Sequence, residues 1–250
     1  MNARHDQVVH AGQPGEGRPR GSCRACGHAG VARVLEVSGL AMDLCPNCAL
    51  AQLADGVGGR CEPIDTPREY VVAAVRTADA ADLLQGNTVR EFGGSHGGRW
   101  LPLLIQLGLR PVHEQPADVV VDSFGLAHEA DQRGALHRLA TATAPEGILL
   151  IQYQCVADAI RRGDWNMLHP NHFAYYSLTA LMRLLAGVGM SVIGAWDLEM
   201  HGGSVLIAAI HAGQWPVDGG VSRMLADEQQ LKITAPEAFS ALQVLADRRY

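Results

Sequence analysis

The sequence has no excess of positive charge. Its 250 residues include 20 lysines and arginines against 26 aspartates and glutamates, which gives a formal net charge of -6 at pH 7. Nucleic acids and anionic membranes select proteins that present a basic face. The charge therefore argues against both as partners.

Long apolar runs are also missing. No uninterrupted apolar stretch is long enough to cross a bilayer, and the opening residues lack the apolar core of a signal peptide. We therefore expect a cytoplasmic protein. The sequence contains no internal repeat, but 48% of its residues are hydrophobic, enough to bury a sizeable core in one large domain or in a small and a medium one.

Four of the six cysteines form two C-x-x-C pairs. Cys23 and Cys26 lie in CRAC, Cys45 and Cys48 lie in CPNC, and eighteen residues separate the pairs. Cysteines in a cytosolic chain favour metal binding or catalysis over disulfides. The spacing is typical of a structural zinc site with four thiolate ligands, and the intervening VARVLEVSGLAMDL alternates as a hairpin does. We predict one such zinc site and treat the other cysteines, Cys61 and Cys155, as ordinary small residues.

A connector rich in glycine and proline, ADGVGGRCEPIDTPREY, follows the predicted zinc module. After it come a helical pattern, the strand, turn and helix of TVREFGGSHGGRWLPLLIQLGLRP, and further alternating strands and helices. This alternation is typical of an α/β sheet covered by helices. The predicted organisation is a disordered tail (1–20), a zinc-binding module (21–55), a connector with a helix (56–86) and an α/β catalytic domain (87–250).

A cluster of histidines and tyrosines precedes an apolar helical pattern in LHPNHFAYYSLTALMRLLAGVGM. Neutral imidazoles exchange protons near physiological pH, and phenols donate or accept hydrogen bonds. The cluster therefore suits acid/base chemistry. A packed connection between two elements would explain the same residues.

These segments together resemble a known enzyme family. The four-cysteine module, the glycine-rich turn from Glu91 to Gly98, DVVVDSFGLAHEAD, APEGILLIQ, HPNHFAYYS and HGGS occur in the order found in zinc-containing S-adenosylmethionine-dependent C-methyltransferases that modify nucleotide-linked deoxysugars. The likeness runs from Cys23 to about Gly213 and is specific because the pieces occur together. It implies a shortened Rossmann-like, methyltransferase-type sheet with a small N-terminal zinc module.

The resemblance also implies site residues. The catalytic positions are His128, His169, Asn171 and His172. The glycine-rich turn, in which glycines let a ligand approach the backbone, gives the cofactor-binding positions Glu91, Gly93, Gly94 and Gly97. Further candidates for substrate binding are Tyr175, Tyr176 and His201, with at least one tyrosine expected in the core.

The chain departs from the family pattern in two places. Nineteen residues between Gly98 and Asp118 have room for one helix and a short connection, not for the two strands and a helix of the family. Glu114 is the only acid there, so we predict that S-adenosylmethionine binds weakly or not at all. Asn171 and His169 replace the glutamate and tyrosine of the family, and Ser123 and Phe124 replace two asparagines.

Three functions remain open at this stage. The first is methyl transfer to a carbon atom of a small molecule, such as a nucleotide-linked sugar or a carrier-bound metabolite. The second is cofactor-independent acid/base chemistry by an isomerase, lyase or cyclase on the same scaffold. The third is a non-catalytic, zinc-stabilised accessory protein. The sequence leaves open whether the chain forms a homo-oligomer.

Overall fold

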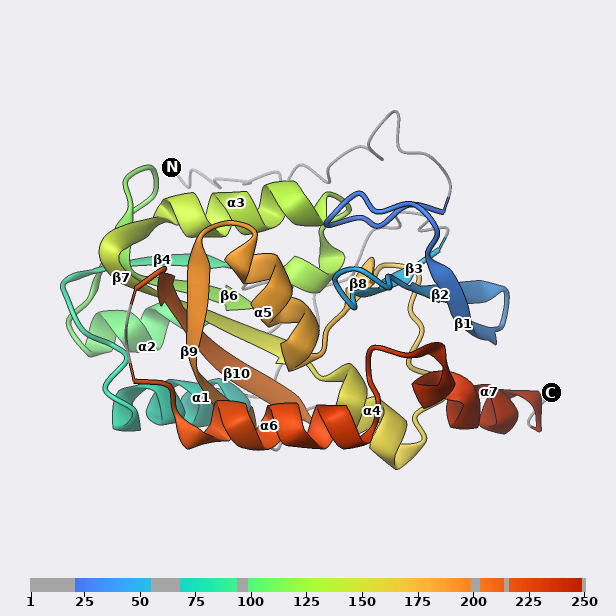
Figure 1. Cartoon of the computed structure of the whole chain (residues 1–250). Coiled ribbons are helices and arrows are strands. Elements are labelled where there is room, and N and C mark those ends of the chain that lie inside the picture. The colour runs from blue at the N-terminus through green and yellow to red at the C-terminus, as the bar shows by residue number, and fades with distance from the viewer. Residues whose placement is uncertain (1–20, 55–67, 94–98, 199–202, 214–215, 249–250) are drawn as a thin grey trace, which may run out of the picture.

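The computed structural model describes residues 21–54, 68–93, 99–198, 203–213 and 216–248. Two sheets organise these residues, one of four strands in the order β1-β2-β3-β8 and one of six strands in the order β5-β4-β6-β7-β10-β9 (Figure 1). Among the described residues, no helix combines the length and the apolarity needed to span a membrane.

The strands are β1 (Ala32–Val37), β2 (Leu40–Leu44), β3 (Ala51–Leu53), β4 (Thr88–Phe92), β5 (Arg110–Pro111), β6 (Ala117–Ser123), β7 (Thr143–Gln154), β8 (Ala174–Tyr175), β9 (Met190–Leu198) and β10 (Ser204–His211). The helices are α1 (Arg68–Ala80), α2 (Leu101–Gln106), α3 (Gln132–Ala142), α4 (Val156–Arg162), α5 (Leu178–Ala186), α6 (Gly219–Gln230) and α7 (Ser240–Asp247), with 3-10 turns η1 (Gly125–His128) and η2 (Pro236–Phe239).

The six-stranded sheet confirms the predicted α/β class. Strands β5, β4, β6 and β7 run parallel, and β10 is antiparallel to both of its neighbours, β7 and β9. From β4 the chain passes through α2 to β5 on one side, and then returns to the other side of β4 as β6. In such sheets, ligands bind where the strand order reverses, at the carboxyl ends of the strands. Here that point lies between the ends of β4 and β6.

The interval between Gly98 and Asp118 holds one more element than the sequence predicts. It contains α2 and the strand β5, of which Arg110 and Pro111 pair with Thr88 and Val89 of β4. Two residues show no periodicity, and a proline lacks the N–H that a central strand needs, so β5 can only be an edge strand. No strand lies beyond it in the described part of the chain.

Helices cover both faces of the six-stranded sheet (Figure 1). Buried side chains of α1 and α2, among them Val75 and Leu104, share a core with Val119 and Leu206 of the sheet. Helices α3, α5 and α6 pack on the opposite face. The helix α1, which the sequence analysis groups with the connector, is therefore part of the α/β layer structure.

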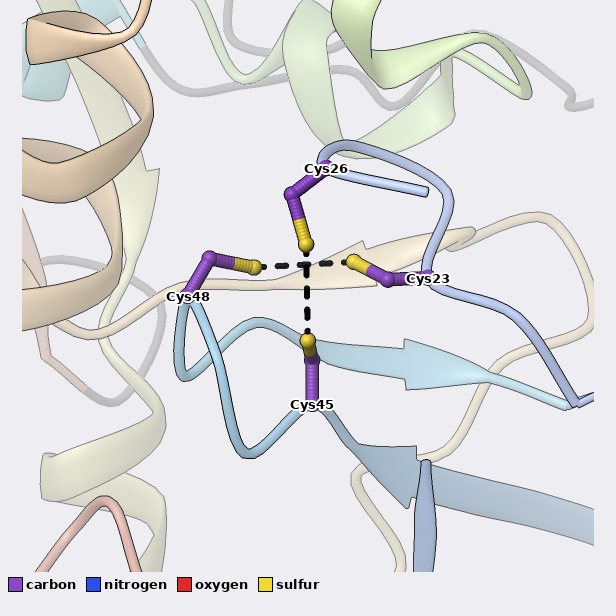
Figure 2. A group of neighbouring side chains, drawn as sticks. All are labelled: Cys23, Cys26, Cys45 and Cys48. Carbon is purple, nitrogen blue, oxygen red and sulfur yellow. Dashed lines mark hydrogen bonds between the residues drawn. The ribbon is translucent and has the colours of Figure 1, made fainter. Parts of the chain in front are cut away.

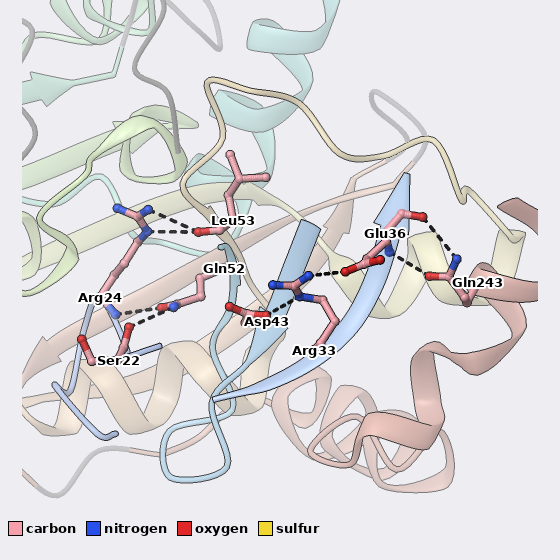
Figure 3. A network of polar contacts seen from close by, with 8 residues as sticks. All are labelled: Ser22, Arg24, Arg33, Glu36, Asp43, Gln52, Leu53 and Gln243. Carbon is pink, nitrogen blue, oxygen red and sulfur yellow. Dashed lines mark hydrogen bonds and ion pairs between the residues drawn. The ribbon is translucent and has the colours of Figure 1, made fainter. Parts of the chain in front are cut away.

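The small sheet is assembled from distant parts of the chain. Strands β1 and β2 form the predicted hairpin, and β3 pairs with β2. Strand β8, from the region after the histidine cluster, pairs with β3, with Gln52 opposite Ala174. Helix α7 packs on β1, where the Gln243 side chain accepts a hydrogen bond from the Glu36 N–H (2.7 Å) and donates one to the Glu36 carbonyl oxygen (3.2 Å) (Figure 3). Helix α7 therefore supports the predicted zinc-binding module.

A buried glutamate of α6 holds the start of α5. The Glu228 carboxylate is 2% exposed and accepts hydrogen bonds from the Leu178 N–H (2.6 Å), the Thr179 N–H (2.8 Å) and the Thr179 hydroxyl (2.6 Å). Free N–H groups and the positive end of the helix dipole both favour a negative charge at this position. Helix α5 directly follows the segment that carries His169 and His172, so Glu228 also helps to place that segment.

Replacing Glu228 with alanine should lower the free energy of unfolding by about 2–5 kcal/mol, because it leaves buried N–H groups of α5 without an acceptor. Urea unfolding followed by circular dichroism measures the change. The control is Glu237→Ala, at an exposed acid of η2, which should change stability by less than about 0.5 kcal/mol. Equal effects of the two substitutions would contradict the proposed capping role.

Candidate active site and metal centre

The four cysteines converge on one point (Figure 2). The Sγ atoms of Cys23 and Cys48 are 3.5 Å apart, those of Cys26 and Cys45 are 3.6 Å apart, and all four lie within 4.8 Å of one another. A tetrahedron with Zn–S bonds of about 2.3 Å has edges of about 3.8 Å. The donor set and its dimensions therefore suit zinc.

Two similar turns place these thiols. The carbonyl oxygen of Cys23 accepts from the Gly27 N–H (3.1 Å), and that of Cys45 accepts from the Ala49 N–H (2.9 Å). Gly27 and Ala49 both have positive φ, 73° and 62°, which reverses the chain after each pair. Cys155 lies elsewhere in the core, where burial raises the pKa of its thiol to about 12. Cys61 is outside the described residues.

The structure brings three of the predicted histidines together. His128 ends the turn η1, and its ring lies edge-on to that of His172, with 4.5 Å between ring centres. The ring centre of His169 is 5.2 Å from that of His172. His128 and His172 are half-buried, and His169 is exposed. Two turns from different parts of the chain thus form one group of imidazoles.

Backbone contacts fix the tautomers of two of these rings. His128 Nδ1 is 3.0 Å from the carbonyl oxygen of Asn171, which can only accept, so Nδ1 carries the proton and Nε2 of the neutral ring has the lone pair. His169 Nδ1 accepts from the Asn171 N–H (3.3 Å), which places the proton of neutral His169 on Nε2. In their neutral forms, His128 therefore offers a base at Nε2 and His169 offers a donor at Nε2. Asn171 contributes to this arrangement through its backbone, whereas the sequence analysis assigns it a catalytic position.

The turn η1 is held by buried polar side chains that the sequence analysis missed. Asp122 accepts a hydrogen bond from the Leu126 N–H (2.9 Å), and the Gln132 side chain donates one to the Leu126 carbonyl oxygen (2.8 Å). An acid at the end of the apolar strand DVVVDS was a signal for Asp122. The sequence contains no such signal for Gln132, because Tyr176, whose hydroxyl binds its side chain, is 44 residues away.

The two tyrosines predicted as substrate contacts, of which at least one was expected in the core, are both buried. Tyr176 is 1% exposed, and its hydroxyl donates to Gln132 Oε1 and to the Leu126 carbonyl oxygen. Tyr175 is 6% exposed, and its hydroxyl accepts from the His169 N–H (2.9 Å). Burial raises the pKa of both phenols. Both tyrosines therefore support the histidine turns from inside.

The described part of the glycine-rich turn lies against η1. Gly93 has a φ of 71°, and a Cβ at that position would lie 2.6 Å from the Gly125 nitrogen, so only glycine allows the two turns to touch. Glu91 accepts a hydrogen bond from the Trp100 N–H at the start of α2, and burial raises the pKa of this carboxyl group. The other predicted positions, Gly94, Gly97 and His201, lie outside the described residues.

Two of the predicted cofactor-binding residues, Glu91 and Gly93, are among the described residues. Glu91 and Gly93 lie where the strand order reverses, and the contact of Gly93 with Gly125 brings that point next to the turn of His128. At the neighbouring edge, β5 has only two residues, and Glu114 beyond it is exposed. Among the described residues, this edge offers no buried acid to hold a ribose.

The buried carboxyl group of Asp122 should make the stability of the folded protein depend on pH. Asp122 is 3% exposed, and burial raises its pKa from 3.8 to about 7, although the N–H groups of Leu126 and Gly125 oppose that rise. An acid whose pKa is higher in the folded than in the unfolded state stabilises the fold below the unfolded value and loses that contribution as pH rises to the folded one. Stability from this group therefore falls between about pH 4 and pH 7.

The substitution Asp122→Asn should remove this fall. The raised pKa corresponds to at most about 4 kcal/mol, so the variant should gain about 2–4 kcal/mol on the wild type between about pH 4 and pH 8. Urea unfolding across that range measures it. The control, Asp118→Asn, should act in the opposite sense, because hydrogen bonds from Asn87 and Thr88 lower the pKa of Asp118. Parallel pH profiles of Asp122→Asn and the wild type would refute the assignment.

Two comparisons of the sequence with known proteins both identify methyltransferases. A sequence profile of a methyltransferase domain family matches residues 26–194. The C-methyltransferase NovU of Streptomyces niveus is 26% identical over 182 residues, a match that covers 59% of this chain and 43% of that protein. The chain thus spans less than half the length of this relative.

Solved structures show weaker similarity. The CcbJ methyltransferase of Streptomyces caelestis is 13% identical with a TM-score of 0.43, and the match covers 59% of this chain and 91% of that one. The 1,6-didemethyltoxoflavin-N1-methyltransferase of Burkholderia thailandensis is 16% identical with a TM-score of 0.40, covering 73% of this chain and 100% of that one.

Proposed function

Because the chain belongs to the methyltransferase domain family, we propose that it transfers a methyl group to a carbon atom of a small secondary metabolite, with histidine as the general base. The similarity to a C-methyltransferase supports carbon as the acceptor atom. The substrate class that we propose is a nucleotide-linked deoxysugar, on the resemblance of the ordered motifs. Zinc has a structural role in this proposal.

The observation that carries the proposal is the fixed tautomer of His128. Its Nδ1–H donates to the Asn171 carbonyl oxygen, so the lone pair of the neutral ring is on Nε2, and the His172 ring lies edge-on to the His128 ring. No carboxylate is available from position 171, and an imidazole is a competent base near neutral pH. His128 is therefore the base that the geometry favours.

The proton and electron changes follow from this arrangement. S-adenosylmethionine, when bound, would supply an electrophilic methyl group, and the electron pair of its S–CH₃ bond would stay on sulfur in the leaving S-adenosylhomocysteine. The acidic C–H bond of the substrate breaks, its proton goes to Nε2 of His128, and its electron pair becomes the new carbon–carbon bond. The Asn171 carbonyl oxygen stabilises the imidazolium through its hydrogen bond from Nδ1. The neighbouring glycine-rich turn would hold the methyl donor through Glu91 and Gly93.

Thermal shift with S-adenosylmethionine, S-adenosylhomocysteine and a panel of nucleotide sugars tests the proposal, because a ligand of the folded state raises the melting temperature. We expect S-adenosylmethionine to stabilise the protein only at high concentration, since the edge at β5 is short. Mass spectrometry of stabilising sugars, incubated with the methyl donor, should then detect a product heavier by one CH₂ group. A panel without any such product would refute methyl transfer to this class.

The two-residue strand β5 favours a second candidate function, in which the histidines catalyse an isomerisation, elimination or cyclisation without the methyl donor. Stabilisation by sugars alone, with S-adenosylmethionine inert at every concentration, would support this candidate. Stabilisation by neither class would favour an accessory protein that binds a partner enzyme or a carrier-bound substrate.

A further inference from the structure

The segment that carries His169 and His172 is hydrogen-bonded to the zinc-binding module through Phe173, the residue directly after His172. Phe173 donates its N–H to the Ala127 carbonyl oxygen of η1 (2.8 Å) and accepts from the Leu53 N–H of β3 (3.2 Å). The next two residues form β8, the fourth strand of the small sheet. Phe173 therefore contacts both the zinc module and the turn of His128.

Arg24 is the side chain that joins this attachment to the metal ligands. It lies between Cys23 and Cys26, and its guanidinium donates two hydrogen bonds to the Leu53 carbonyl oxygen, at 3.3 and 3.2 Å (Figure 3). Its Cζ atom lies 5.0 Å from the centre of the Phe173 ring, a cation–π contact. Arg24 thus connects the metal-binding turn with β3 and with the residue that follows His172.

The Gln52 side chain fixes the backbone of the same turn. Its Oε1 accepts from the Arg24 N–H (2.7 Å), and its Nε2 donates to the Ser22 carbonyl oxygen (3.1 Å), while Gln52 itself is fully buried (Figure 3). The turn therefore has a defined position relative to β3 before Arg24 reaches Phe173. A shift of the turn would move the guanidinium away from both of its partners.

We propose that Arg24 is a positioning residue through which the zinc-binding turn sets His172 against His128. Zinc then does more than stabilise its own module, because it fixes the turn from which Arg24 holds Leu53 and Phe173. The consequence for turnover rests on the proposed methyltransferase function, but the ordering of residues 169–175 does not. Lysine would keep a cation over the ring and lose the forked pair of hydrogen bonds, so Arg24→Lys should be intermediate.

Hydrogen exchange of the zinc-loaded full chain tests the ordering. In Arg24→Gln, amide exchange in residues 169–175 should accelerate at least about tenfold, while exchange in β10 (Ser204–His211) stays unchanged. Arg24→Lys should accelerate it less. The matched control is Arg33→Gln in the same module, since the ion-pair partners of Arg33 are Glu36 and Asp43 rather than Leu53 and Phe173. Removing zinc from the wild type with a chelator should accelerate exchange in 169–175 as well.

A spectroscopic readout follows the histidines themselves. Nitrogen NMR of the His128 ring should show one dominant tautomer in the wild type and in Arg33→Gln, and a mixture in Arg24→Gln, because the Asn171 carbonyl oxygen is no longer held in place. If the proposed reaction is detected, kcat of Arg24→Gln should fall on the order of 100-fold, the effect of a misplacement of about 1 Å.

The outcomes separate the two proposals. Equal exchange in Arg24→Gln and Arg33→Gln, or a parallel acceleration in β10, would overturn the positioning role, whatever the activity. Faster exchange in 169–175 with a mixed His128 tautomer would support it, even if no nucleotide sugar is methylated and the proposed function fails.

Discussion

The substitution His128→Asn should lower kcat by about two to four orders of magnitude, the usual effect of removing a general base. The asparagine amide can replace Nδ1–H as the donor to the Asn171 carbonyl oxygen, now 3.0 Å away, but it has no counterpart of Nε2. The substitution therefore removes the base and keeps the contact between the two turns. The measurement is the initial rate of methyl transfer at saturating substrate.

The melting temperature separates catalysis from stability in this experiment. It should change little in His128→Asn, because the backbone contact is kept. The control is His137→Asn, at an exposed histidine of α3, which should retain wild-type activity. The companion substitution His172→Ala should also lower kcat, since it removes the ring that packs on His128. Full activity per folded molecule in His128→Asn would assign the imidazole a structural role only.

Loss of zinc should produce the largest loss of stability. Purified protein should contain about one zinc ion per chain, and Cys45→Ser should abolish that content and unfold the module. Binding of structural zinc contributes about 10–16 kcal/mol to the folding of isolated zinc-finger peptides. Cys45 is fully buried, and without the metal the small sheet would depend on its strand pairing and on packing such as that of α7 on β1, so a decrease of tens of degrees in melting temperature is expected on this scale.

The control for the zinc prediction is Cys155→Ala. Cys155 is 7% exposed and distant from the metal-binding cysteines in sequence, so its substitution should leave the zinc content unchanged and cost no more than an ordinary core change. Elemental analysis and thermal unfolding of both variants measure the difference. A metal-free wild-type chain with unchanged stability would exclude the zinc site.

The sequence predicted those features that depend on local spacing. Two C-x-x-C pairs around an alternating segment predict converging thiols, and the cysteines converge as that pattern requires. The alternation of strands and helices predicts the α/β class, and nineteen residues cannot hold two strands and a helix whatever surrounds them. Strand β5 could not be predicted from spacing, because its two residues pair with β4 only once β4 is in place.

Only the tertiary structure decided how the site is supported. The tyrosines of HPNHFAYYS look equally suited to a ligand and to a core, and only the tertiary packing shows that Tyr176 is buried against Gln132. His128 and the Asn171 carbonyl oxygen are 43 residues apart, and Arg24 reaches Phe173 across a longer interval still. Spacing in a sequence reports contacts within one element or turn. Contacts between elements depend on how the two sheets pack together, and that packing determines which nitrogen of His128 can take a proton.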